Sequence, residues 1–187
     1  MTKFRCSSWV RSVAPHAAAA CAALACFTLG NVASAQDVAG VNLKAAAIYR
    51  FVPFAEWPAD VLPPSAPLTI CVVGDPAMRD ALERTIKTAK SPRRQIVVAF
   101  GTPDKPPAPC HVLYVSGVSQ SQTSRLVAGV RDLPVLTMSD LEGFNRLGGI
   151  TEFFFEAGQI RFSIRLDAVT QSHLQLSSQL LKLARTR

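Results

Sequence analysis

The sequence has few of the residues from which catalytic and metal sites are built. Only 3 histidines occur among its 187 residues. There is no G-x-S-x-G nucleophile elbow and no Walker-type phosphate loop. The two histidines beyond residue 35, His111 and His173, are not spaced as metal ligands. We therefore expect no catalytic residue, no metal and no cofactor, and an enzyme is the least favoured class of function.

A basic stripe interleaved with aromatic residues is also missing, which argues against binding to nucleic acid. The formal net charge of +7 exaggerates the basic character of the chain. Three of its basic residues, Lys3, Arg5 and Arg11, stand at the amino end without an acidic neighbour. Without them 17 basic residues face 13 acidic ones, a net charge of +4.

This amino end has the pattern of an export signal. Residues 17–29 form an uncharged apolar run that is shorter than the ~20 residues of a spanning helix. Ala33-Ser34-Ala35 then provides a small-x-small cleavage site. The pattern predicts a removed signal peptide over residues 1–35 and a single exported domain over residues 36–187. A membrane anchor, or a lipoprotein acylated at Cys26, are the alternatives.

Cysteine is scarce once this leader is removed. Of 5 cysteines only Cys71 and Cys110 remain, so one intramolecular pairing is possible. An exported domain meets an oxidising compartment, which favours a disulfide over two unrelated buried thiols. Such a bond is either a structural staple or a redox switch.

Short apolar runs alternate with amphipathic segments along the first part of the domain. Strands are predicted at residues 68–73, 95–100, 111–115 and 134–138, and helices at 42–54, 78–88 and 121–130. Pro53 should kink or end the first helix. This alternation predicts a single α/β domain with a mainly parallel, doubly wound sheet flanked by helices. In a 2-1-3 strand order, Cys71 and Cys110 fall on neighbouring strands.

The pattern changes after Gly148-Gly149. Residues 151–155 and 159–166 read as an antiparallel hairpin around Glu156-Ala157-Gly158. Apolar and polar residues alternate along the second strand, which predicts one face in the core and one face exposed to solvent. The core face would hold Ile160, Phe162, Ile164 and Leu166. The solvent-exposed face would hold Arg161, Ser163 and Arg165. A short helix at 167–172, an extended piece at 174–176 and a helix at 177–184 follow.

One candidate ligand crevice lies where the predicted parallel strands end, since ligands of open α/β sheets bind at that edge. The residues there are Gly74, Asp75, Gly117, Ser139 and Asp140. Ordinary turn residues are the alternative interpretation. Ser139-Asp140 is in addition a good N-cap pair for a short helix through Arg146.

A candidate partner surface comprises Trp57, Arg161 and Arg165. Tryptophan is enriched in interface hot spots. However, the arginines can equally blunt a sheet edge against aggregation. Trp57 also belongs to an aromatic cluster with Tyr49, Phe51 and Phe54, for which a core role is favoured over an interface.

The ordered set of segments resembles the YfiR-like family of exported bacterial proteins. The segments are KAAAIYRF (44–51), EWP (56–58), LTICVVGD (68–75), CHVLYV (110–115), PVLTMSD (134–140), GGI (148–150), IRF (160–162) and LSSQLLKLA (176–184). Cys71 and Cys110 match the position of the family's core disulfide. A second disulfide of some members has no counterpart near residues 143–151, so any redox response would depend on one bond.

The resemblance implies a regulatory protein of the periplasm. Such proteins bind the periplasmic domain of an inner-membrane diguanylate cyclase of the YfiN type and hold it inactive, which lowers cyclic di-GMP and biofilm formation. The resemblance also implies a homodimer and an outer-membrane lipoprotein as a further partner. The alternative is a periplasmic small-molecule receptor that feeds a transporter or a sensor.

Overall fold

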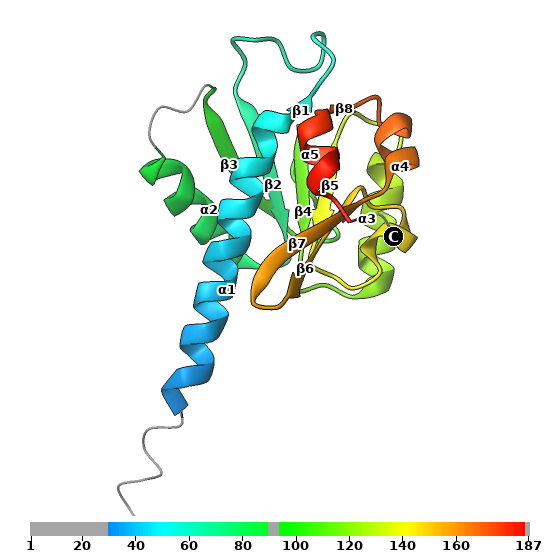
Figure 1. Ribbon diagram of the computed structural model, residues 1–187. Coiled ribbons are helices and arrows are strands. Elements are labelled where there is room, and N and C mark those ends of the chain that lie inside the picture. The colour runs from blue at the N-terminus through cyan, green and yellow to red at the C-terminus, as the bar shows by residue number, and fades with distance from the viewer. Residues whose placement is uncertain (1–29, 90–93, 186–187) are drawn as a thin grey trace, which may run out of the picture. The chain divides into compact units, whose positions relative to one another are not determined.

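The computed structural model describes residues 30–89 and 94–185, with the backbone alone for residues 30–37. The chain divides into two compact units, Met1–Asp37 and Val38–Arg187, and the second is the fold described below (Figure 1). The predicted leader lies outside the described residues, except that residues 30–35 belong to the first helix.

A six-stranded mixed sheet forms the centre of the fold, in the order β3-β2-β4-β5-β6-β7. Strands β2 to β6 run parallel to their neighbours, and β7 pairs antiparallel with β6. This confirms the predicted α/β class with its carboxyl-terminal hairpin. The bounds are β2 Leu68–Val73, β3 Ile96–Gly101, β4 Val112–Val115, β5 Leu136–Ser139, β6 Thr151–Glu156 and β7 Gln159–Ile164. Two further strands, β1 (Ala55–Glu56) and β8 (Gln175–Leu176), form a small antiparallel sheet.

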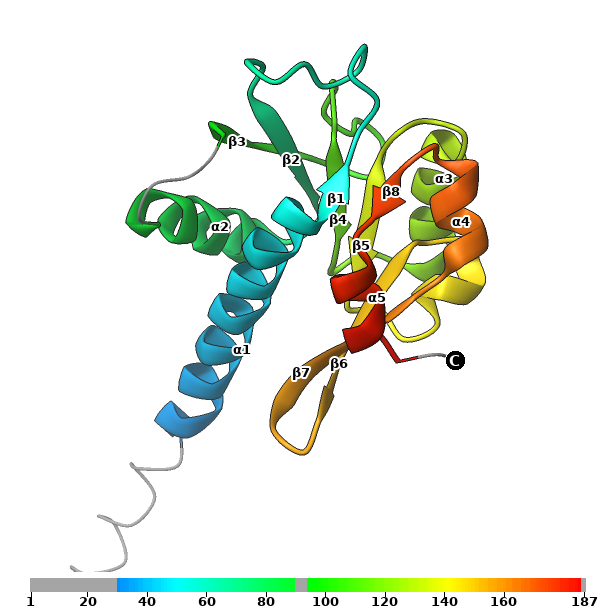
Figure 2. The ribbon, with the colours of Figure 1, turned by 45° about the horizontal axis from the view of Figure 1, so that its top comes forward.

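Helices cover both faces of the sheet (Figures 1 and 2). The larger core lies on the face covered by α1 (Gly30–Phe51), α2 (Pro76–Thr88), α4 (Leu166–Gln171) and α5 (Ser178–Leu183). The smaller core lies on the opposite face, under α3 (Gln120–Val130). Alternate residues of β2 serve the two cores, Ile70 and Val72 the first, Cys71 and Val73 the second.

The first helix begins earlier than predicted and ends where predicted. It starts at Gly30 rather than at residue 42, because the stretch before Asn42 contains no proline and the single glycine within it, Gly40, is tolerated inside a helix. At its other end Phe51 is the last α-helical residue, and Pro53 lies in the 3-10 turn Val52–Phe54. Proline lacks the N–H that a continuing helix requires, so the chain leaves the helix here and turns into β1.

The β6–β7 hairpin has the predicted tight turn, with Ala157 and Gly158 both at positive φ (48° and 74°). The predicted alternation of β7 was wrong at two residues. Ser163 is buried, because the turn that contains Asn145 packs over it. The Ser163 hydroxyl donates a hydrogen bond to Asn145 Oδ1 (2.5 Å), so this polar group is satisfied inside the protein. Leu166 is 57% exposed, because β7 ends at Ile164 and Leu166 already starts α4.

The predicted N-cap at Ser139-Asp140 was also wrong. Ser139 is the last residue of β5, and the helical turn that follows is the 3-10 segment Phe144–Leu147. The Ser139 hydroxyl still accepts a hydrogen bond from the Leu141 N–H (3.0 Å), but it donates to Val115 O of the neighbouring strand (2.6 Å). It therefore ties two strand ends together instead of starting a helix.

Candidate functional site

The five residues of the predicted crevice meet at the carboxyl edge of β2, β4 and β5. Gly74 has φ 98°, and a Cβ there would collide with the Ser116 carbonyl. Asp75 accepts a hydrogen bond from the Ala77 N–H (2.9 Å) and caps α2. Gly117, at φ 69°, turns the chain after β4. These contacts are those of well-formed turns, and ligand binding at this crevice stays a prediction.

Asp140 links two other elements to that edge through hydrogen bonds of its carboxylate. Its carboxylate accepts hydrogen bonds from Lys44 Nζ (2.5 Å) and from the Ser116 hydroxyl (2.9 Å). Burial alone would raise the pKa of Asp140, but the hydrogen bond and charge of Lys44 outweigh it, so this pKa is lowered. The ion pair fastens α1 to the end of β5 across 96 positions of sequence.

Tyr114 lies beneath this network. Its side chain is fully buried, and its hydroxyl has no hydrogen-bond partner among the described residues. Burial raises the pKa of Tyr114, and the negative charge of Asp140 adds to the effect. The phenol is therefore neutral and contributes to the core. Sequence reasoning missed Lys44, Ser116 and Tyr114, because only the fold brings them to Asp140.

The three residues of the predicted partner surface do not form one surface. Trp57 lies near the start of β4, where its indole N–H donates to His111 O (3.2 Å). Arg161 is on β7, at the far edge of the sheet, with Glu156 at 3.9 Å. Arg165 bonds Asp167 (2.6 Å) and donates to Asn145 O (3.0 Å). Trp57 therefore lies apart from the two arginines.

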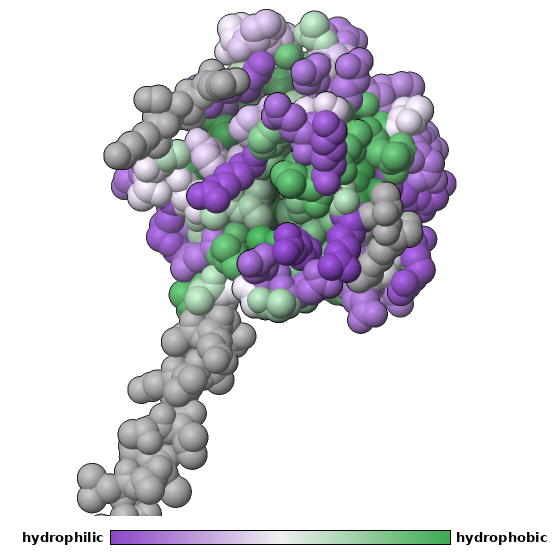
Figure 3. Space-filling view, viewed as in Figure 1, coloured by the Kyte–Doolittle hydropathy of each residue, from purple (hydrophilic) through white to green (hydrophobic). Residues whose placement is uncertain are grey.

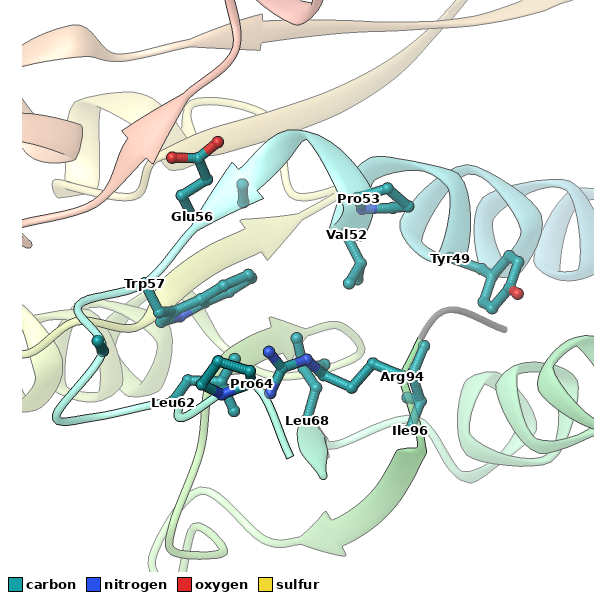
Figure 4. A pocket seen from close by; sticks show the side chains of 12 residues that line it. Tyr49, Val52, Pro53, Glu56, Trp57, Leu62, Pro64, Leu68, Arg94 and Ile96 are labelled. Atoms are coloured by element: carbon teal, nitrogen blue, oxygen red, sulfur yellow. The ribbon is translucent and has the colours of Figure 1, made fainter. Parts of the chain in front are cut away.

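Trp57 lines an apolar hollow of about 550 Å³ at the amino ends of β2 and β3, called the Trp57 hollow below (Figure 4). Its wall combines the end of α1, the loop after β1 and the first residues of the two strands. The lining residues are Tyr49, Val52, Pro53, Ala55, Glu56, Trp57, Ala59, Leu62, Pro64, Leu68, Arg94 and Ile96. Hollows of this size with a few polar groups are typical binding sites.

His111 holds the Trp57 indole in place. The two rings meet edge to face, with centroids 6.5 Å apart, and the His111 carbonyl accepts the indole N–H. The His111 ring is fixed in turn, because its Nδ1 accepts a hydrogen bond from the Thr69 N–H (3.0 Å). Nδ1 is therefore unprotonated, and the imidazole is neutral with its proton on Nε2.

Arg94 shapes the opposite wall of the hollow. Its Nη1 donates to Pro63 O and Ala66 O, both at 2.6 Å, and so holds the loop between β1 and β2 against the strands. A guanidinium has five N–H donors, so further donors remain for a bound carbonyl or carboxylate. In Figure 4 the guanidinium of Arg94 extends toward Pro64 and Leu62, below the Trp57 ring. The hollow is suited to an apolar or aromatic side chain beside an acceptor group.

The state of His111 makes stability depend on pH. Burial lowers the pKa of His111 below its usual 6.5; a backbone hydrogen bond at Val61 opposes the shift, and the Arg94 charge adds to it. As the pH falls, the His111 imidazole therefore takes up a proton at a higher pH in the unfolded chain than in the folded protein. The contribution to folding is therefore present above pH 6.5 and lost as pH falls through the lower folded pKa.

We expect the free energy of unfolding to fall between pH 7.5 and pH 5, and less so in His111→Asn, whose Oδ1 replaces Nδ1 as acceptor. Urea titrations at several pH values measure this. His173→Asn is the control, because Asn tolerates the φ of 55° at that position. An equal loss of stability in His111→Asn and the unchanged protein would contradict the assignment.

The structure contains the predicted disulfide between Cys71 on β2 and Cys110 just before β4, with Cα atoms 5.8 Å apart. Cys71 is fully buried in the smaller core. Within the described residues no group of three metal-ligating side chains occurs. The described helices include none that is long and apolar enough to cross a membrane.

Comparison with known proteins assigns this chain to a family. No curated protein matches the chain. A family model described as YfiR/HmsC-like matches residues 41–185, a range that includes every strand of the described residues and the end of α1. This chain belongs to the YfiR/HmsC-like family.

Proposed function

We propose that this protein is a periplasmic regulator that binds the periplasmic domain of an inner-membrane diguanylate cyclase and holds the enzyme inactive. Cyclic di-GMP and biofilm formation then fall. Family membership over residues 41–185 carries the proposal. The predicted export signal supports it, because a protein outside the cytoplasm reaches only the outward domain of such a cyclase.

The Trp57 hollow is the surface that we assign to the cyclase. It offers a fixed indole, an apolar wall and spare donors of Arg94. A second, more open hollow adjoins it, since Tyr49 and Pro53 line both, and continues to Ser177 at the start of α5. Apolar side chains also gather on this face in the region of α4 and α5, where Leu166 and Leu183 are 57% and 70% exposed (Figure 3). Exposed apolar patches of this kind often serve as protein interfaces.

Retention of the isolated cyclase domain by the immobilised protein tests the proposal. The purified periplasmic domain of the cyclase from the same organism should be retained and should elute as a defined complex. A gene for such a cyclase near this gene is expected as well. Absence of retention, with both proteins folded, would contradict the proposal.

We further propose that an outer-membrane lipoprotein is a second partner and that it releases the cyclase. The support is again the family resemblance, which implies control by such a lipoprotein. A lipoprotein that contacts the same apolar face would compete directly with the cyclase.

A homodimer is the third part of the proposal, and the free edge of β3 supports it. Gln95 O accepts from the Leu68 N–H (2.9 Å), so the backbone of Gln95 points toward β2. Because backbone groups alternate along a strand, those of Ile96, Val98 and Phe100 point away from β2. No described strand pairs with them. A charge-free edge of this kind is open to a further strand.

The edge is complementary to a second copy of itself. In an antiparallel pair centred on Val98, each Ile96 lies opposite the partner's Phe100 and each Val97 opposite the partner's Ala99. No charged residue occurs within β3, so no like charges meet. The two sheets would then become one continuous sheet.

Val98→Pro is expected to shift the protein from dimer to monomer, with at least a tenfold higher dissociation constant by sedimentation equilibrium. Proline removes the outward N–H of residue 98 and is tolerated on an edge strand. Leu133→Ser, which changes a 51% exposed apolar residue outside β3, is the control. A Val98→Pro variant that dimerises normally would exclude this edge.

A further inference from the structure

A separate apolar hollow, of about 520 Å³, lies on the opposite face of the sheet from the Trp57 hollow. The proline-rich loop between β3 and β4 forms one wall, with Pro107 and Pro109, and α3 forms the other, with Leu126 and Val130. We call it the proline hollow. Its size and apolar lining fall within the range of small-molecule sites.

Arg125 is the only charged residue that lines the proline hollow. It has no ion pair or hydrogen bond with another described residue. Gly129, four residues after Arg125, also lines the hollow. Residues four apart lie on the same side of a helix, so Arg125 and Gly129 belong to one face of α3. An unpaired cation at the rim of an apolar hollow favours an occupant with an apolar body and one negative group.

Gly129 provides independent support. It lies within α3, where glycine weakens a helix relative to alanine. Packing does not require it, because a Cβ at this position would meet no atom within 4 Å. A side chain there would instead extend from α3 where the helix borders the hollow. The glycine therefore keeps space free that no residue of the described chain fills.

From these observations we propose that the proline hollow binds a small amphipathic monoanion, such as an aliphatic or aromatic carboxylate. Its apolar part would lie between the prolines and α3, and its anionic group would face Arg125. The proposal does not depend on the interaction with a cyclase, and its test uses none.

Decanoate and 1-decanol, below micellar concentrations, are suitable probes, since they share a chain and differ in charge. By calorimetric titration of the purified protein, decanoate should bind about fivefold more tightly than decanol. Arg125→Gln should remove that preference and leave the affinity for decanol unchanged. Arg131→Gln, at the C-cap of the same helix and outside the lining, should change neither.

Gly129→Leu should weaken binding of both probes at least tenfold, because its side chain occupies the hollow. Gly129→Ala should raise the melting temperature, which verifies that packing does not need the glycine. Absence of saturable binding, or equal binding of both probes by all variants, would overturn the proposal. If Gly129→Leu fails to fold, the Arg125→Gln comparison decides alone.

Discussion

Loss of the Cys71–Cys110 disulfide is expected to lower the free energy of unfolding by about 4 kcal/mol, the value for closing a loop of this length in the chain-entropy model. The two cysteines are 39 positions apart. The bond joins β2 to the segment entering β4, two central strands whose pairing begins at Ile70 and Val112. Domains of this size have total stabilities of about 5–15 kcal/mol, so the loss is a large share of the whole.

Urea titration of the oxidised protein, the protein reduced by a phosphine, and two variants measures this effect. Cys110→Ser removes the bond while the fully buried Cys71 stays in place. Cys71→Ser removes the bond and also leaves a hydroxyl in the core, so it should lose more. An unchanged free energy of unfolding after reduction would show that the bond does not stabilise the fold.

Replacement of Trp57 by alanine is expected to weaken binding of the cyclase domain by about 2 kcal/mol, close to thirtyfold, as for a tryptophan hot spot. The indole is held by the His111 carbonyl and by the edge of the His111 ring. A partner therefore meets a side chain that is already ordered, and little conformational entropy is lost on binding. Titration calorimetry with the purified cyclase domain measures the change.

Two variants separate binding from folding in that experiment. Trp57→Phe keeps an aromatic ring and loses the indole N–H, so an intermediate loss of affinity is expected. Phe155→Ala truncates a 53% exposed aromatic residue on the β6–β7 hairpin, away from the hollow, and should bind normally. Normal binding by a folded Trp57→Ala variant would exclude the Trp57 hollow as the interface.

The centre of the sheet could be predicted from sequence because its central strands, β2, β4 and β5, are buried on both sides. Parallel strands such as β2 and β4 appear as continuous apolar runs bounded by turn residues, and their order follows from the winding rule. The same rule placed Cys71 beside the segment of Cys110. Pro53 likewise marked the end of α1, because its effect on a helix is local.

The site could not be predicted to the same extent, because its contacts are long-range. Lys44 and Asp140 form an ion pair across 96 positions of sequence, and no local pattern joins them. Ser163 is buried only because the turn containing Asn145 folds over β7. The Trp57 hollow depends on Arg94 holding a loop about thirty positions away. Such groupings are properties of the assembled fold.

The level of cyclic di-GMP in cells tests the central claim most directly. Deletion of this protein should raise cyclic di-GMP in cells that contain the intact cyclase. It should have no effect where the cyclase lacks its periplasmic domain. Restoring the protein with its export signal should reverse the rise. A cyclic di-GMP level that is unchanged by the deletion, or that rises equally with the truncated cyclase, would contradict the account.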